Sequence, residues 1–225
     1  MKNKNYGILN IRLIDRIIEN KRLEMLSILK RKIDKNIIRS YLDIGTTEEN
    51  KLKSSNFFLK KLSKIKIKKS ITDQNIKKGL FNKVLKKSIV SNFSNNQISN
   101  YKSDLVVSSA TIEHVGNFNN QLKMFKNIAK LTNKIFFITT PYRFFPLDFH
   151  TKLPFIHMLP KKIHRYILKI LFLDEYAKEE NLNLLDAGEI DTLINKINKK
   201  DFYIVIDKIK LFGVVSNLLI TGIKK

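Results

Sequence analysis

The sequence predicts an α/β fold of three layers, α/β/α, in which a doubly wound, mostly parallel sheet of seven strands lies between helices. Three observations support this. Short apolar segments alternate with amphipathic segments of helical period. Most of the apolar segments end in a polar loop, and the last two follow each other with no helix between them. Alternation of this kind is typical of parallel sheets, and the direct connection predicts an antiparallel last strand.

The predicted strands are short apolar runs. Residues 65–71 alternate Ile with Lys, which is the period of a strand with one exposed face. Residues 104–108 and 135–139 are almost continuously apolar and predict buried strands, the second of which stops at Pro141. The seven predicted strands cover residues 37–44, 65–71, 87–90, 104–108, 135–139, 202–206 and 214–220.

The predicted helices carry apolar residues three and four positions apart. Residues 8–33 predict one or two amphipathic helices, and Thr46 or Thr47 is placed to cap a helix at residues 48–62. All four prolines fall between positions 141 and 160, which predicts a long, shaped loop. The remaining predicted helices cover residues 118–131, 161–172 and 185–197.

The composition describes a basic chain with a real core and no cysteine chemistry. The 225 residues are 43% hydrophobic and carry a formal net charge of +23. Lys contributes 36 of the 43 basic residues and Arg only 7, beside 23 Asn, which indicates AT-rich coding bias rather than a dedicated nucleic-acid site. The absence of Cys excludes disulfides, thiolate metal sites and a Cys nucleophile. No signal peptide or membrane span is recognisable, so we expect a soluble, cytoplasmic protein.

Ligands of such sheets bind beyond the carboxyl ends of the strands, which directs attention to two loops. Gly45 follows Asp43 at the end of a strand, and a glycine lets the backbone approach a ligand closely. The loop has one Gly and no Lys, so it is not a phosphate-binding loop, and a purely structural turn remains open. Glu113 and His114 follow the strand at 104–108. They are either site residues or a local cap and a packed loop histidine.

Three motifs, in this order, resemble the class I S-adenosylmethionine-dependent methyltransferases, closest to the type 11 branch. They are Leu42-Asp43-Ile44-Gly45, the run from Asp104 to Val115 that contains Ile-Glu-His-Val, and the strand ending Phe-Ile-Thr-Thr-Pro141. The later run from Phe145 to Pro160 and the closing Ser216-Asn-Leu-Leu219 look like a bacterial subgroup of that branch. The resemblance covers roughly residues 37–221 and implies a Rossmann-like fold with S-adenosylmethionine as cofactor.

The resemblance also implies which residues hold the cofactor. The loop after the first strand would contact its methionine part, Asp73 its ribose hydroxyls, and Asn92 its adenine amino group, with Phe93 covering the ring. The chain departs from the family's glycine-rich pattern at Thr46 and Thr47. The full set of expected cofactor-binding residues is Asp43, Gly45, Thr46, Thr47, Asp73, Asn92, Phe93, Ser108 and Ser109.

His114 is the candidate base for an acceptor that must lose a proton, and Glu113 would orient it or contact the cofactor. Residues 1–36 are expected to form a helical extension and residues 37–225 the methyltransferase domain, in which residues 141–182 form a loop and helix on the substrate side. No metal ligands are assigned. The expected substrate-binding residues are Tyr142, Arg143, His150 and His157, although structural hydrogen bonding within the loop remains open for both histidines.

The function expected from these features is methyl transfer, by in-line displacement, to a small-molecule or glycan/lipid-precursor acceptor. A nucleic-acid methyltransferase is an alternative, ranked lower because Thr111-Ile-Glu-His114 stands where an Asn-Pro-Pro-aromatic motif is usual. A catalytically inactive cofactor-binding protein is another. The basic amphipathic segment at 161–172 also fits contact with an anionic membrane surface, although helices of this kind more often pack on a sheet. The acceptor and the oligomeric state stay open.

Overall fold

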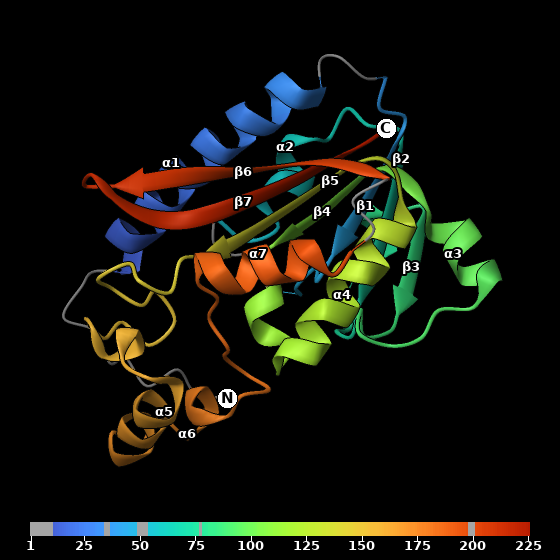
Figure 1. Cartoon of the computed structure of the whole chain (residues 1–225). Helices are drawn as coiled ribbons and strands as arrows, with labels where there is room; N and C mark the ends of the chain where they lie inside the picture. Colours follow the sequence, from blue (N-terminus) through green and yellow to red (C-terminus); the bar gives the residue numbers. More distant parts are fainter. Residues whose placement is uncertain (1–10, 34–36, 49–53, 77, 198–200) are drawn as a thin grey trace.

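The computed structural model describes residues 11–33, 37–48, 54–76, 78–197 and 201–225. Its centre is a seven-stranded sheet in the order β3-β2-β1-β4-β5-β7-β6 (Figure 1). β1 to β5 pair in parallel, and β7 runs antiparallel to both of its neighbours, which confirms the predicted sheet. The strands are β1 (Ser40–Ile44), β2 (Ile67–Thr72), β3 (Lys83–Lys86), β4 (Ser103–Ser109), β5 (Thr132–Pro141), β6 (Phe202–Leu211) and β7 (Val214–Lys224).

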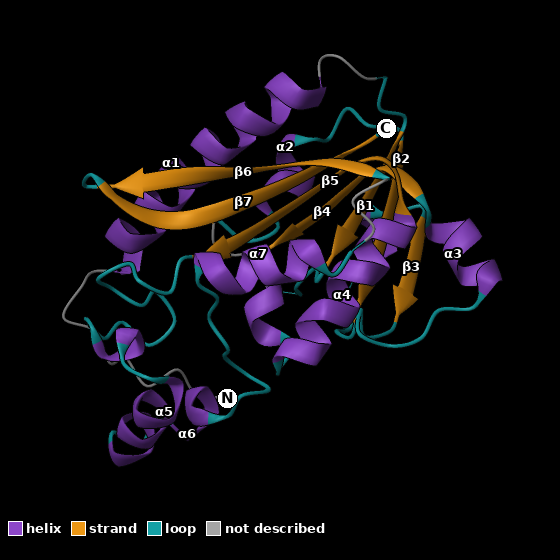
Figure 2. Cartoon of the chain, viewed as in Figure 1, coloured by secondary structure: helices purple, strands orange, loops and turns teal. Residues whose placement is uncertain are grey.

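Helices cover both faces of the sheet, with α1 and α2 on one side and α4 and α7 on the other (Figure 2). Side-chain caps set several of their starts: Asn117 accepts a hydrogen bond from the Asn120 amide before α4, and Asp186 forms a capping box with Glu189 before α7. The helices are α1 (Ile11–Ile33), α2 (Phe57–Lys61), α3 (Asn95–Tyr101), α4 (Phe118–Leu131), α5 (Lys161–Ile170), α6 (Asp174–Ala177) and α7 (Ala187–Asn195).

The pleat of the strands divides the core into two halves. Successive side chains of a strand point to opposite faces, so Leu105 of β4 packs toward α1 and the next residue, Val106, toward α4. α1 is part of this core, because Met25 and Leu29 are buried against the sheet. α1 thus packs on one face of the sheet, and its residue Arg22 lines a cavity at the edge where the parallel strands end.

Two predicted elements differ from the structure. The helix expected at 48–62 is reduced to α2, residues 54–56 form a turn, and 49–53 lie outside the described residues. Asn56 has a left-handed φ of 49°, and its side chain accepts a hydrogen bond from the Thr47 amide (3.1 Å) and donates one to the Thr47 carbonyl (2.9 Å), which closes a loop in place of a longer helix. The strand expected at 87–90 was wrong: β3 ends at Lys86, and the chain turns at once.

The segment 141–182 leaves the end of β5 and carries α5 and α6 away from the sheet (Figure 1). α5 packs against α6 and a short 3₁₀ turn at Ile156–Met158. Across the part of the chain that the structure describes, no helix has both the length and the apolar character needed to cross a membrane.

Candidate active site

The turn after β1 brings two loops of the sheet edge into contact. Gly45 has a φ of +81°, a left-handed conformation that favours glycine, and a Cβ added there would lie 2.5 Å from Thr111 Oγ1. Thr111 belongs to the loop after β4 and donates a hydrogen bond to the Ile44 carbonyl (3.3 Å). Glycine is therefore required at this position for the two loops to approach each other.

The carboxylate of Asp43 stabilises the same turn through hydrogen bonds. It is buried and accepts hydrogen bonds from the Tyr41 hydroxyl (2.5 Å) and from Thr46 Oγ1 (2.5 Å). Burial raises the pKa of Asp43 to about 6, although both hydrogen bonds favour the charged form. Thr46 is buried and also bonds Ser70 Oγ (2.8 Å), so its side chain holds the turn together.

Three cavities open at this edge of the sheet and meet at Ala110, which lines all of them. The central cavity, of 170 Å³, lies between the Asp43–Thr47 turn, residues 54–58 and Arg22. The β2-side cavity, of 350 Å³, continues from it past Gly45 and Thr47. The α1-side cavity, of 230 Å³, lies on the other side and shares Arg22, Ser109 and Ala110 with the central one. Because neighbouring cavities share lining residues, the three form one continuous depression that extends from Asp73 to α1.

Part of the expected cofactor-binding set lines the central and β2-side cavities. Asp43 and Ser109 line the central cavity, Asp73 lines the β2-side cavity, and Gly45 and Thr47 line both. These five residues come from three separate loops. Each stands at or just after the end of a predicted strand, where the sequence placed the functional residues, and their role in binding a cofactor is what the family resemblance implies.

The rest of that set lies elsewhere. Ser88, Ile89 and Val90 line the β2-side cavity where Asn92 and Phe93 were expected, because the chain turns directly after β3. Phe93 instead packs against the core. Ser108 is buried inside β4 beside Ser109, and its hydroxyl has no hydrogen-bond partner among the described residues.

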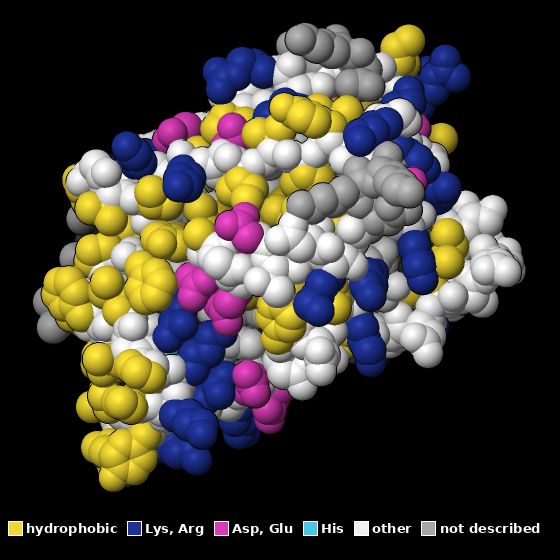
Figure 3. Space-filling model, in the orientation of Figure 1, with side chains coloured by type: hydrophobic (Ala, Val, Ile, Leu, Met, Phe, Trp, Pro, Cys, Tyr) yellow, Lys and Arg dark blue, Asp and Glu magenta, His cyan; other side chains and the backbone are white. Residues whose placement is uncertain are grey.

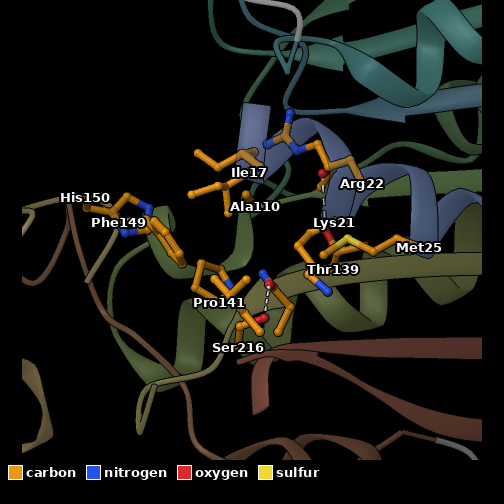
Figure 4. A pocket seen from close by; sticks show the side chains of 14 residues that line it. Ile17, Lys21, Arg22, Met25, Ala110, Thr139, Pro141, Phe149, His150 and Ser216 are labelled. Carbon is orange, nitrogen blue, oxygen red and sulfur yellow. Dashed lines mark hydrogen bonds between the residues drawn. The ribbon is translucent and has the colours of Figure 1, made fainter. Parts of the chain in front are cut away.

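The α1-side cavity has walls from distant parts of the chain (Figure 4). One wall is a face of α1 and includes Arg22. The opposite wall comes from β5 and β7, and His150 with Phe149 closes a third side. Burial lowers the pKa of Arg22, and the negative charges of Glu113 and Asp15 offset part of this effect. The sequence reasoning missed Arg22, because an amphipathic pattern does not show which surface the helix covers.

Glu113, His114 and His150 form a cluster between the α1-side and β2-side cavities. Glu113 is fully buried, and its Oε2 accepts a hydrogen bond from Thr140 Oγ1 (3.1 Å). His114 Nε2 lies 3.1 Å from His150 Nε2, which in turn lies 3.9 Å from Glu113 Oε1. His150, predicted to bind substrate, thus lies beside both predicted catalytic residues, Glu113 and His114. It is 36 positions beyond His114 in the chain.

Asp148 sets the charge around His150. Its Oδ1 lies 3.1 Å from His150 Nδ1. Burial by itself would lower the pKa of His150, but the hydrogen bond and charge of Asp148, together with the charge of Glu113, outweigh it and raise this pKa. Burial would likewise raise the pKa of Asp148, but hydrogen bonds from His150 and Thr151 and the charge of His150 hold it well below its usual value.

The other expected substrate-binding residues are not among those that line the α1-side cavity. Tyr142 packs against the core and bridges to Leu185. Arg143 donates hydrogen bonds to the carbonyls of His157 (3.3 Å) and Leu159 (2.7 Å). His157 is buried, with Nε2 2.6 Å from the Phe145 carbonyl. In the structure these side chains hold the 141–160 loop in shape.

Solved structures with a similar fold include several methyltransferases. The N-methyltransferase NodS of Bradyrhizobium japonicum, in complex with S-adenosylhomocysteine, matches with a TM-score of 0.52 at 10% identity, over 90% of this chain and 86% of its own. A 1,6-didemethyltoxoflavin N1-methyltransferase of Burkholderia thailandensis matches at 0.56 and 10% identity, over 92% and 79%. The small RNA methyltransferase HEN1 matches at 0.58 and 11% identity, over 91% of this chain and 25% of its own.

These likenesses show a fold and not a reaction. One matching structure is described as a putative Zn-dependent alcohol dehydrogenase of Rhodobacter sphaeroides. No protein-family model matches the chain, and no curated protein matches it in sequence. The chain therefore has the Rossmann-like fold of class I methyltransferases, and its activity must be argued from the site.

Proposed function

We propose that this protein is an S-adenosylmethionine-dependent methyltransferase that acts on a small-molecule or glycan/lipid-precursor acceptor. The observation that carries the proposal is the meeting of three cavities at Ala110, on the carboxyl edge of the sheet. An elongated cofactor and a separate acceptor need two compartments with a shared boundary, and open α/β sheets bind their ligands at this edge. Complexes of similar fold with S-adenosylhomocysteine support the choice of cofactor.

The central and β2-side cavities fit such a cofactor. Gly45 provides the close backbone approach that a side chain would block. Asp73 is an exposed carboxylate on the β2-side cavity, suited to accept two hydrogen bonds from a ribose diol. Arg22 presents a guanidinium to the central cavity and suits the carboxylate of the cofactor's amino-acid part. When bound, the cofactor supplies a methyl group already activated on a sulfonium.

The α1-side cavity would hold the acceptor. Residues of α1 and β5 line it, and a bound acceptor that fills it would displace water and be held in line, the conditions on which in-line displacement mainly depends. His114 and His150 stand at its border with the β2-side cavity, where an imidazole can take a proton from an acceptor hydroxyl or amine. Glu113 and Asp148 face His150, and their negative charges raise its pKa.

A surface beside this cavity favours an acceptor attached to a lipid. Figure 3 shows hydrophobic side chains gathered over α5 and α6, next to Lys and Arg side chains. On α5, Ile163, Tyr166 and Ile170 form one exposed face, and Phe172 beyond its end is 88% exposed. Contiguous exposed apolar surface of this kind marks interaction sites. The exposed apolar residues of the segment are Phe144, Phe155, Leu159, Ile163, Tyr166, Ile170, Leu171 and Phe172, which we call the insertion patch.

An RNA or DNA acceptor is the second candidate. The net charge of +23 and the likeness in fold to HEN1 favour it. The basic excess is nearly all Lys, which neutralises phosphates without reading bases, so the small-molecule or lipid-linked acceptor is preferred.

Calorimetric titration with S-adenosylhomocysteine tests the proposal without knowledge of the acceptor. Wild-type protein should bind it with 1:1 stoichiometry, and Asp73→Ala should weaken binding about tenfold through the loss of a bidentate, charge-assisted contact. Asp191→Ala, on the exposed face of α7, removes the same charge away from the cavities and serves as the control. Absence of binding to the wild-type protein, or equal affinities for all three, would contradict the proposal. Binding without turnover on any acceptor would indicate the inactive cofactor-binding alternative.

A further inference from the structure

Three electron-pair donors converge on one point of the site. Glu113 Oε1, His114 Nε2 and His150 Nε2 all lie within 4.8 Å of one another. The two imidazole nitrogens are 3.1 Å apart, and Glu113 Oε1 is 3.9 Å from His150 Nε2. Two histidines and a carboxylate form a donor set typical of divalent first-row metal sites.

The partners of the other ring nitrogens determine which atoms carry a proton. His114 Nδ1 lies 2.6 Å from the Asn181 carbonyl oxygen, which can only accept, so this nitrogen is the donor. His150 Nδ1 faces the carboxylate of Asp148 at 3.1 Å, which fixes the same tautomer. In neutral rings both Nε2 atoms then present lone pairs to each other. Such an arrangement is repulsive unless a proton on one ring or a metal cation lies between them.

The buried carboxylate gives an independent indication. Glu113 is fully buried, and its Oε1 has no hydrogen-bond partner among the described residues, although Oε2 has one. A buried carboxylate oxygen without a partner is costly in free energy. This atom is one of the three that lie within 4.8 Å of one another, so a cation bound among them would give it a partner.

We propose that Glu113, His114 and His150 bind a divalent cation of the zinc type. In a tetrahedral site with metal–nitrogen bonds of about 2.0–2.1 Å, two ligand nitrogens lie about 3.3 Å apart, close to the 3.1 Å between the histidines. Glu113 Oε1, 3.9 Å from His150 Nε2, would move closer when the cation binds. Three protein ligands leave one position open, as in catalytic zinc sites. Asp148 and the Asn181 carbonyl act as the second-sphere acceptors that orient metal-bound histidines.

The location suggests a use for the open position, and this step rests on the proposed methyltransferase function. His150 lines the α1-side cavity and His114 the β2-side cavity, so the cation would lie at the boundary between acceptor and cofactor. A cation there would bind an acceptor oxygen, orient it and make its hydroxyl more acidic. Because both imidazole lone pairs would bind the cation, this route would replace proton abstraction by His114 or His150. The acceptor class is then one with a hydroxyl group at the methylated position.

Metal binding is measured on the full chain, made without a histidine tag, stripped with EDTA and titrated with Zn²⁺ by calorimetry, in the absence of cofactor and acceptor. We expect one equivalent of Zn²⁺ to bind the wild-type protein with micromolar or tighter affinity. His150→Ala and Glu113→Gln should each weaken this binding about 100-fold. His164→Gln, which changes a histidine of α5 outside the cluster, should leave it unchanged. Titration with Co²⁺ should produce visible absorption bands of a tetrahedral site in the wild-type protein and in His164→Gln, but not in His150→Ala or Glu113→Gln.

Failure of the wild-type protein to bind Zn²⁺ overturns the proposal, whether or not the variants fold. Equal Zn²⁺ binding by the wild-type protein, His150→Ala and Glu113→Gln, with both variants shown to be folded by circular dichroism, also overturns the proposal. In that case His114 and His150 share a proton and not a metal ion. Binding of Zn²⁺ without binding of S-adenosylhomocysteine would support the metal site and contradict the methyltransferase function, so the two failures are distinguishable.

Discussion

Replacement of Asp43 by Asn should make the stability difference between variant and wild type depend on pH. Asp43 is buried at the end of β1, where burial raises its pKa from 3.8 to about 6. The charged carboxylate is therefore less favourable in the folded protein than in the unfolded chain. Asn has similar size and can still bond the hydroxyls of Tyr41 and Thr46, but it carries no charge to bury.

The magnitude follows from the two pKa values. At 1.36 kcal/mol per pH unit, the shift corresponds to about 3 kcal/mol of free energy of unfolding. The folded pKa is raised, so this stability is fully present below the unfolded pKa of 3.8 and is lost as the pH rises through about 6. About 2 kcal/mol of it should be lost between pH 4.5 and pH 8. The Asn variant should therefore gain about 2 kcal/mol over the wild type between these pH values.

The assay is urea unfolding of both proteins, without ligand, at several pH values between 4.5 and 8. Other titrating groups are common to both proteins and cancel in the difference of their free energies of unfolding. Asp191→Asn on the exposed face of α7 is the matched control for removal of one charge. A difference for Asp43→Asn that stays constant across this range would refute the reasoning that burial dominates at Asp43.

Two further predictions concern the core and the surface. Gly222→Ala should destabilise the protein by about 1–3 kcal/mol, because the added Cβ would overlap the ring of Phe136. Denaturant unfolding measures this difference. The control Gly79→Ala, whose added Cβ meets nothing within 4 Å, should have a much smaller effect. The wild-type protein should float with vesicles that contain anionic phosphatidylglycerol, through the insertion patch and its neighbouring lysines. Phe172→Asp should weaken flotation, whereas Leu80→Asp, an exposed apolar residue at the β3 end of the sheet, should not. Equal flotation of both variants would exclude the patch as the contact.

The order of strands and helices could be predicted because hydrophobic period is a local property. The alternation of Ile and Lys in residues 65–71 anticipated β2, and the spacing of apolar residues placed α4 at residues 118–131. One error occurred where a side-chain contact outside the helical period decides the backbone. Asn56 bonds Thr47 and closes a loop where helical spacing favoured a longer helix.

The candidate site was predictable only in part for the same reason. Asp43, Gly45 and Asp73 were selected because parallel strands bring their carboxyl ends to one edge whatever their sequence separation. In the segment 141–160, the sequence pattern did not distinguish residues that line a cavity from residues that only stabilise the loop. Of its candidates, His150 reaches the cavity, whereas Arg143 is held by backbone carbonyls of the same loop.

The sequence by itself determined the layered α/β architecture and the edge of the sheet at which chemistry would occur, since both depend on local period and on the geometry of parallel strands. Only the tertiary structure decided that Arg22 of the first helix reaches the turn after β1, and that His114, His150 and Glu113 meet at one point. These are contacts between segments far apart in the chain. Their distances depend on how loops pack against the completed sheet, and no short-range pattern records that packing.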